Sequence, residues 1–281
     1  MNPIQLSTNL AALQAQRAMK LNQAGLERSL SRLATGYRVS SAADDPGAVG
    51  VASRLEARAR SFQVVERGMM VAVEMAKTAE GGSAEIVDTL QRMRELAVQA
   101  SDGALTSTDR TDIDTEYQEL LDEIDRLAGS TTYNDRELLA GTASTVDFRV
   151  GVDTTTDDVL SVGFGGVSAS GLGVGTTLLT GTNATNATAA ITAIDTALGT
   201  MGTKRARFGA AISRLGFALS NGQGMRSRLE ASVAAIREVD LAEETTMAAR
   251  YQILLEAGAS ALASAQGIRS QIVRALLGID G

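Results

Sequence analysis

The stretch SLSRLATGYRVSSAADDPGAVGVASRL, residues 29–55, decides how the chain is organised. Its first part continues a pattern that begins at residue 4, in which leucines recur at steps of three and four, as on one face of a helix. Gly36 and the polar residues after it break that pattern. Asp45 can cap a new helix, and Pro46 fits the first turn of one. The stretch therefore predicts that one helix ends near residue 34 and that a second begins at Pro46.

Helical spacing recurs on both sides of a short central insertion. Apolar residues return every three or four positions up to about residue 127, and again from about residue 187 onward. Between Thr145 and Gly163, branched or aromatic residues alternate with polar ones, which predicts a β-hairpin. We therefore expect a mainly α fold of long antiparallel coiled-coil helices, formed by the N- and C-terminal halves, with a small β-hairpin and loop insertion at about residues 141–187.

The two ends of the chain are expected to pair with each other. Residues 1–45 with 238–281 would form a terminal coiled-coil domain, and residues 46–237 a second helical domain. The first helix carries too few large apolar side chains to offset, alone, the ordering of its residues. Pairing still leaves apolar rows exposed on the outer faces. We therefore expect both terminal segments to be poorly ordered in the monomer and to fold on assembly.

The composition excludes most catalytic and binding chemistry. The chain has no Cys and no His, which removes thiolate nucleophiles, imidazole acid–base groups and the commonest zinc ligands. Its formal net charge of −7 gives no basic surface for nucleic acid. The longest uncharged run is rich in Gly, Thr and Ser, so no membrane span is expected. We predict no catalytic, cofactor-binding or metal-binding residue and no enzymatic activity.

Four long motifs resemble those of bacterial flagellins. They are Ser29–Leu55, then LQRMRELAVQASDG at Leu90–Gly103, EYQELLDEIDRLAGSTTYND at Glu116–Asp135, and REVDLAEETTMAARYQILLEAGASALASA from Arg237. The similarity covers nearly the whole helical part, and the motifs stand in the same order as in that family. The large central surface domains of longer flagellins have no counterpart here, so the chain resembles a short form.

What the resemblance implies is a secreted structural subunit that polymerises into the bacterial flagellar filament and serves motility. The terminal domain would form an inner tube, the second helical domain an outer tube, and export would pass through the flagellar type III channel. The protein would then be extracellular, in the filament. The residues expected to drive inner-tube packing are Leu6, Leu10, Leu13, Leu254, Ile268 and Ile272.

The resemblance also implies a set of partners. The main partner is the chain itself, as a helical homopolymer, and the others are a flagellar export chaperone, the filament cap and the hook–filament junction proteins. The surface sensed by a vertebrate Toll-like receptor would map onto Arg92, Leu96 and Glu116. Assembly is the preferred explanation for this face, with receptor binding an incidental consequence. No cofactor, nucleic acid or membrane is expected.

Two other functions stay open at this point. A hook–filament junction protein shares these terminal helices but forms a thin ring instead of a long filament. A cytoplasmic coiled-coil adaptor would have folded termini and would not be recovered from culture medium after shearing.

Two local patterns are assigned to the protein surface instead of to a binding site. Alternating acidic residues imitate the start of a calcium loop, but the glycine needed for the sharp turn is missing, so a solvated helix face is expected. A small basic cluster is expected to make ion pairs between subunits. The acidic residues are Asp112, Asp114 and Glu116, and the basic ones are Lys204, Arg205 and Arg207.

Overall fold

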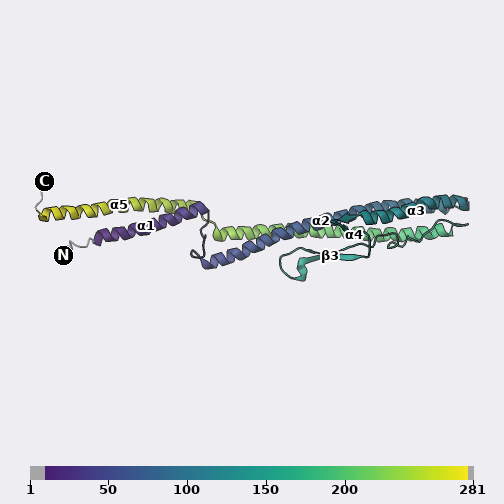
Figure 1. The fold of residues 1–281 in the computed structure, drawn as a ribbon, viewed down its shortest axis with the longest axis horizontal. Helices are drawn as coiled ribbons and strands as arrows, with labels where there is room; N and C mark the ends of the chain where they lie inside the picture. Colours follow the sequence, from purple (N-terminus) through teal and green to yellow (C-terminus); the bar gives the residue numbers. More distant parts are fainter. Residues whose placement is uncertain (1–9, 278–281) are drawn as a thin grey trace. The chain divides into compact units, whose positions relative to one another are not determined.

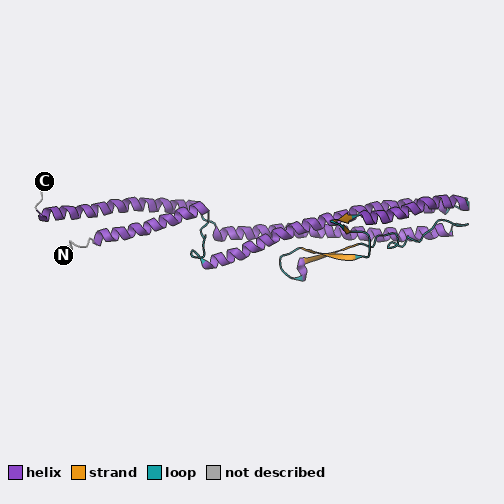
Figure 2. Cartoon of the chain, in the orientation of Figure 1, coloured by secondary structure: helices purple, strands orange, loops and turns teal. Residues whose placement is uncertain are grey.

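The predicted mainly α fold is confirmed. The computed structural model describes residues 10–277, apart from the side chains of Ala11, Ala265 and residues 268–277. Within that range it contains five α-helices and two small antiparallel hairpins in the middle of the sequence (Figures 1 and 2). The helices are α1 (Leu10–Thr35), α2 (Pro46–Ala100), α3 (Ser107–Ser130), α4 (Thr185–Arg237) and α5 (Leu241–Leu277).

The chain divides into two compact units. The first comprises residues 1–57 with 229–281, and the second comprises residues 58–228. Both limits fall inside continuous helices, because α2 and α4 each contribute to both units. The sequence had suggested limits at 45/46 and 237/238, where helices begin and end. A helix break therefore does not coincide with the limit of a packed unit in this chain.

The helix ends follow local hydrogen-bonding rules. Asp45 Oδ1 accepts the Ala48 amide at 2.9 Å, so α2 begins at Pro46 with the cap that the sequence predicted. At the start of α3, Thr106 and Asp109 form a reciprocal capping box. Buried Arg110 donates to the Ala100 carbonyl at 2.9 Å, which satisfies a free carbonyl at the end of α2. The short turn between α2 and α3 is thus closed by side chains.

The predicted β-hairpin is present as β3 (Ser144–Arg149) and β4 (Val159–Phe164), with Val146 opposite Val162. A second, smaller hairpin was not predicted. It joins β1 (Thr132–Tyr133) to β2 (Arg136–Glu137) through a two-residue turn in which Asn134 and Asp135 have φ of 50° and 61°. Both values suit a type I′ turn, which asparagine and aspartate tolerate. The Asn-Asp dipeptide was the sequence signal for this hairpin.

The second unit has an ordinary hydrophobic core. It is built from one face each of α2, α3 and α4, together with β4 and the loop at residues 165–180. Tyr117 is fully buried, and its hydroxyl lies 2.6 Å from Thr177 Oγ1. Burial raises the pKa of Tyr117. Phe164 of β4 packs against Phe208 of α4, with ring centroids 5.7 Å apart. The hairpin is therefore anchored to the helices by aromatic contact.

Asp114 does not lie on a solvated helix face, and that prediction was wrong. Its side chain is buried in the second unit, where Oδ1 accepts the Leu179 amide at 2.7 Å. Three turns further along α3, Asp125 accepts the Ala169 amide at 2.7 Å. These two carboxylates fasten the loop at residues 165–180 to α3. The loop lacks regular structure, so its amides need such side-chain acceptors.

The basic cluster at the middle of α4 is also used inside the chain. Arg205 pairs with Glu80 of α2 at 2.7 Å, and Lys204 donates to the Gly165 carbonyl at 2.8 Å. The expectation of ion pairs between subunits is therefore replaced, for these two residues, by contacts that hold α2, α4 and the loop together.

Gly82 provides a test of this packing. A Cβ atom at Gly82 would overlap the hydroxyl of Thr131 and lie 2.9 Å from its Cγ2, whereas a Cβ at neighbouring Gly81 meets nothing within 4 Å. We expect Gly82→Ala to lower the free energy of unfolding by about 1–3 kcal/mol, as overpacking does. The matched change Gly81→Ala should raise it by up to about 1 kcal/mol, because alanine favours helix. Urea unfolding followed by circular dichroism measures both, and equal effects would contradict the packing described.

Candidate functional site

The terminal helices α1 and α5 form an antiparallel pair, as predicted (Figure 1). Two glycines allow the helices to approach closely. A Cβ atom at Gly25 of α1 would lie 2.6 Å from Cζ of Tyr251, so the tyrosine ring sits directly on the glycine. A Cβ atom at Gly258 of α5 would lie 2.9 Å from Cγ of Met19. Each helix thus inserts one large side chain onto a glycine of the other.

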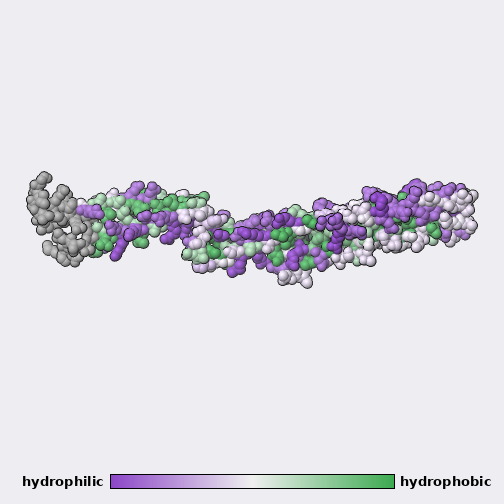
Figure 3. All heavy atoms as spheres, in the orientation of Figure 1, coloured by the Kyte–Doolittle hydropathy of each residue, from purple (hydrophilic) through white to green (hydrophobic). Residues whose placement is uncertain are grey.

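The α1–α5 pair buries almost none of its large apolar side chains. Among the described side chains of the two helices, only Ser29, Glu244 and Ala248 are buried. Hydrophobic residues show on the visible surface of the pair, between hydrophilic ones (Figure 3). The strongly exposed ones, with their exposed fractions, are Leu10 (67%), Leu13 (40%), Leu21 (74%), Leu30 (53%), Leu241 (57%), Ile253 (65%) and Leu254 (39%). Apolar surface of this extent marks an interaction surface.

The expected packing residues are placed as follows. Leu10, Leu13 and Leu254 are exposed on α1 and α5. Leu6 lies outside the described residues. Ile268 and Ile272 belong to α5, but their side chains are outside what the structure describes. Sequence reasoning did not single out Leu21 or Ile253, although both are more exposed than Leu13.

The two helices carry complementary charge where α5 begins. Helix α1 contains Arg17, Lys20, Arg28 and Arg32 against one acid, Glu27, which gives a net charge of 4 − 1 = +3. Helix α5 starts with Glu243 and Glu244. Arg32 Nη1 and Glu244 Oε2 are 3.6 Å apart beside a small polar cleft of about 140 Å³. This ion pair joins the end of α1 to the start of α5.

Backbone hydrogen bonds join the segments that follow α1 and α4. The Arg38 amide donates to the Arg237 carbonyl at 2.7 Å, and the Val239 amide donates to the Gly36 carbonyl at 3.0 Å. Gly36 has φ of 72°, which permits the turn after α1. The Arg237 guanidinium also lies 4.9 Å from the centroid of the Tyr37 ring. The two segments form one joint, which the sequence did not predict because the contacts span about 200 residues.

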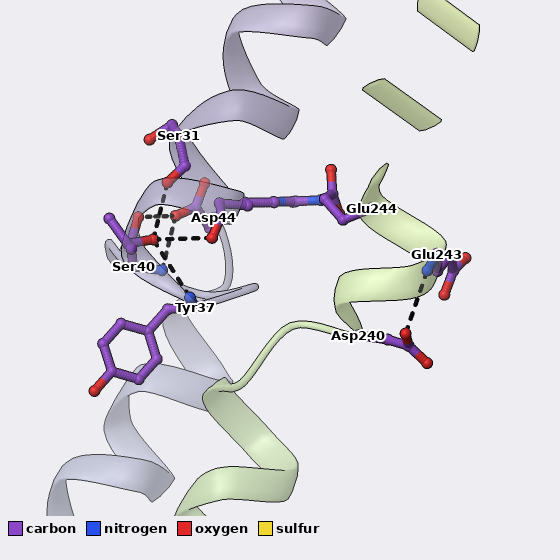
Figure 4. A network of polar contacts seen from close by, with 9 residues as sticks. Ser31, Tyr37, Ser40, Asp44, Asp240, Glu243 and Glu244 are labelled. Carbon is purple, nitrogen blue, oxygen red and sulfur yellow. Dashed lines mark hydrogen bonds and ion pairs between the residues drawn. The ribbon is translucent and has the colours of Figure 1, made fainter. Parts of the chain in front are cut away.

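Two aspartates organise this joint (Figure 4). Oδ2 of Asp44 accepts the amide and hydroxyl of Ser41, both at 3.0 Å, and those of Ser40, both at 3.2 Å. The hydrogen bonds from Ser41, the backbone one first, hold the pKa of Asp44 below its ordinary 3.8. Asp240 Oδ1 accepts the Ala242 and Glu243 amides at 2.9 and 3.2 Å and caps α5.

The residues expected to contact an immune receptor do not share one surface. Arg92 of α2 and Glu116 of α3 are exposed and form an ion pair at 2.7 Å, and Arg92 also pairs with Glu95 at 3.1 Å. The hydrogen bond to Glu116 is the main reason that the pKa of Arg92 is raised. Leu96, however, is only 2% exposed and belongs to the hydrophobic core of the second unit. Its assignment to the exposed surface was wrong, because it lies on the core-facing side of α2.

The described residues contain no group of three or more carboxylates that could hold a metal ion. Within residues 10–277, no helix has both the length and the apolar character needed to cross a bilayer.

Comparison with known proteins identifies relatives over most of the chain. The family model of the bacterial flagellin N-terminal helical region matches residues 6–144, and that of the bacterial flagellin C-terminal helical region matches residues 191–277. The two matches include all of α1, α2, α3 and α5, and therefore both helices of the exposed apolar pair.

Individual relatives match along almost their full lengths. A flagellin of Halalkalibacterium halodurans is 31% identical over 260 residues, or 92% of this chain and 95% of the relative. The flagellar filament core protein flaB2 of Brachyspira hyodysenteriae is 30% identical over 96% of this chain and 98% of its own. A putative flagellar hook-associated protein from Vibrio parahaemolyticus has a similar fold, with a TM-score of 0.57 and 13% identity over 69% of this chain and 100% of that one.

The joint gives a prediction about pH. Because the folded-state pKa of Asp44 is lowered, its hydrogen bonds are present above the ordinary value and are lost as the pH falls through the lower folded-state value. We expect the Ser40 and Ser41 amide resonances to shift with a midpoint below the ordinary value of 3.8 in an NMR titration of the full chain. The Asp44→Asn variant should lack this transition. A midpoint at or above that value would contradict the described hydrogen bonds.

Proposed function

The chain belongs to the bacterial flagellin family, and from that premise we propose how it builds a flagellar filament. It is a structural subunit of the filament. The observation that carries the mechanism is the α1–α5 pair, which among its described side chains leaves six leucines and Ile253 exposed in the single chain. Burial of one such side chain stabilises an assembly by about 1.5–3 kcal/mol. Several of them per subunit supply a strong drive for polymerisation.

Polymerisation of this kind needs an open interface. In such an interface, one surface of a subunit fits a different surface of the next subunit. If the rotation between subunits does not close a ring, subunits add without limit and produce a helical filament. The exposed apolar residues of α1 and α5 are distributed over both helices, so one pair can contact several neighbours. The first unit therefore forms the inner tube, through Leu6, Leu10, Leu13, Leu254, Ile268 and Ile272. The second unit, with its complete core, forms the outer tube.

The same premise gives the setting of the protein. The filament lies outside the cell, and the subunit reaches it by export through the flagellar type III channel with an export chaperone, and adds under the cap. Its function is to transmit torque in motility, without catalysing a reaction. The absence of Cys and His from the sequence is consistent with a role that needs no reactive side chain.

A junction protein between hook and filament is the nearest alternative, since a hook-associated protein shares the fold. The two functions differ in copy number and in filament length. Seeding purified subunits with sheared filament ends, followed by electron microscopy, separates them. Long uniform growth is expected here, and failure to elongate under seeding would favour the junction protein. A cytoplasmic adaptor would likewise not elongate seeds, and it would stay inside the cell.

Leu21 tests the assembly surface. It is 74% exposed, so Leu21→Asp should leave the single chain folded as before by circular dichroism. Loss of about 1.5–3 kcal/mol per added subunit should raise the critical concentration for seeded growth by roughly tenfold or more. The control Leu21→Met retains an apolar side chain and should grow as the unmodified chain does. Leu13→Asp should behave like Leu21→Asp. Unchanged growth of the aspartate variants would show that this surface is not buried in the filament.

Receptor sensing is assigned to Arg92 and Glu116, with Leu96 acting only through the fold. We expect Arg92→Ala to weaken binding to a Toll-like receptor about fivefold or more without changing the unfolding transition. Arg126→Ala, which removes another exposed ion pair of the second unit, is the matched control. Leu96→Ala should instead cost about 2–5 kcal/mol of stability. Calorimetry and surface plasmon resonance separate the two effects, and equal binding by the Arg92→Ala variant would remove Arg92 from the receptor surface.

A further inference from the structure

The leucine pattern of α1 and α5 does not by itself fix how the helices align along their axes. Apolar residues that recur at steps of three and four look alike after a shift of seven residues, so a two-helix pair can slip by one heptad. A well-packed core would prevent slippage, but this pair has no large buried apolar side chain among those described. The alignment therefore depends on a few specific contacts.

Three such contacts lie at regular intervals along the pair. Met19 sits on Gly258, Tyr251 sits on Gly25, and Arg32 pairs with Glu244. From one contact to the next, α1 advances by six and then seven residues while α5 goes back by seven each time. The spacing is that of successive heptads in an antiparallel pair, so all three contacts belong to one alignment.

The glycine contacts discriminate between alignments more strongly than the ion pair. Gly25 is the one glycine of α1. A shift by one heptad would place the Tyr251 ring against Ala18 or Arg32 instead. In the observed alignment, Cζ of Tyr251 lies 2.6 Å from the place where a Cβ atom would stand on Gly25. After a shift, the Cβ atom of Ala18 or Arg32 would occupy that place and overlap the ring. In the shifted alignment, the two helices must therefore move apart or the Tyr251 ring must rotate. Either change loses packing contacts between α1 and α5.

We propose that Gly25 with Tyr251, and Gly258 with Met19, form a register lock that fixes the axial alignment of α1 and α5 and thereby determines the specificity of assembly. The proposal rests on the proposed function, because it concerns the same surface. That surface is composite, with Leu21 contributed by α1 and Ile253 and Leu254 by α5. A slip of one heptad would displace the α5 residues by roughly 10 Å relative to those of α1. Neighbouring subunits would then contact a different arrangement of the exposed apolar residues.

Cysteine cross-linking can read the alignment directly, since the chain has no cysteine of its own. Asn22 lies between Met19 and Gly25 on α1, and Leu255 lies between Tyr251 and Gly258 on α5. Asn22→Cys with Leu255→Cys therefore reports the locked alignment. Asn22→Cys with Leu262→Cys reports an alignment shifted by one heptad. Both pairs are made in the full chain and treated with a short bifunctional maleimide after seeded growth.

We expect the chain with an intact lock to cross-link the first pair at least about tenfold more efficiently than the second. Gly25→Ala should reduce this preference, with Gly258 and Met19 still in contact, and raise the critical concentration for growth. Tyr251→Ala, which removes the ring without adding an atom to α1, should also reduce the preference. In the Tyr251→Ala background, Gly25→Ala should have no further effect, because the ring that it obstructs is absent. Gly267→Ala is the control on α5, where a Cβ atom meets nothing within 4 Å.

The outcomes separate the lock from the proposed function. If the Gly25→Ala chain keeps both the preference for the first pair and the unmodified critical concentration, the lock is wrong. If Gly25→Ala stops growth but leaves the preference for the first pair unchanged, the lock is also wrong, because alignment is then not the cause. If the chain with an intact lock fails to extend seeds, the proposed function fails. The two cysteine pairs would then be compared in the unassembled chain, where cross-linking traps whichever pairing its poorly ordered ends transiently form, and their ratio would still decide the lock.

Discussion

The exposed leucines of α1 and the exposed Ile253 and Leu254 of α5 are the constraint on which the rest of the molecule depends. An antiparallel pair of helices can bury one stripe of each helix, and here that stripe is made of glycine, serine, alanine and a few larger side chains. Six leucines and Ile253 therefore remain exposed on the described part of the pair. We propose that other copies of the chain bury them, so that this unit is complete in the assembled filament.

The second unit is built on the opposite principle. Its helices enclose large apolar side chains, and amides of the irregular loop at residues 165–180 donate hydrogen bonds to buried Asp114 and exposed Asp125. Such a unit is complete as a single chain. Because the second unit encloses its own core, we expect it to fold before assembly, whereas the first unit needs neighbours.

Local chemistry made much of this predictable from the sequence. Leucine spacing placed the helices, Asp45 and Pro46 placed the start of α2, and alternation placed β3 and β4, because each signal acts over a few residues. The failures needed partners distant in the sequence. Leu96 looked like a surface residue and Asp114 like a solvated one until α3, α4 and the loop were packed around them. The role of Asp44 was missed because the segment that it holds contacts the end of α4, about 200 residues away in the sequence. The Asn134–Asp135 hairpin was missed because its strands are only two residues long.

Glycine contacts and leucine contacts answer different requirements in the α1–α5 pair. If leucines filled the seam between the helices, the pair would gain stability as a single chain, but the same leucines could no longer drive contact between copies. Glycines that receive Tyr251 and Met19 define one alignment, and no large apolar side chain of the pair is fully buried among those described. The glycine contacts then select one axial alignment of α1 and α5 by excluding the others. The apolar contacts between subunits supply the stability of the assembled filament. This separation keeps the subunit ready to polymerise and allows only one composite surface to do so.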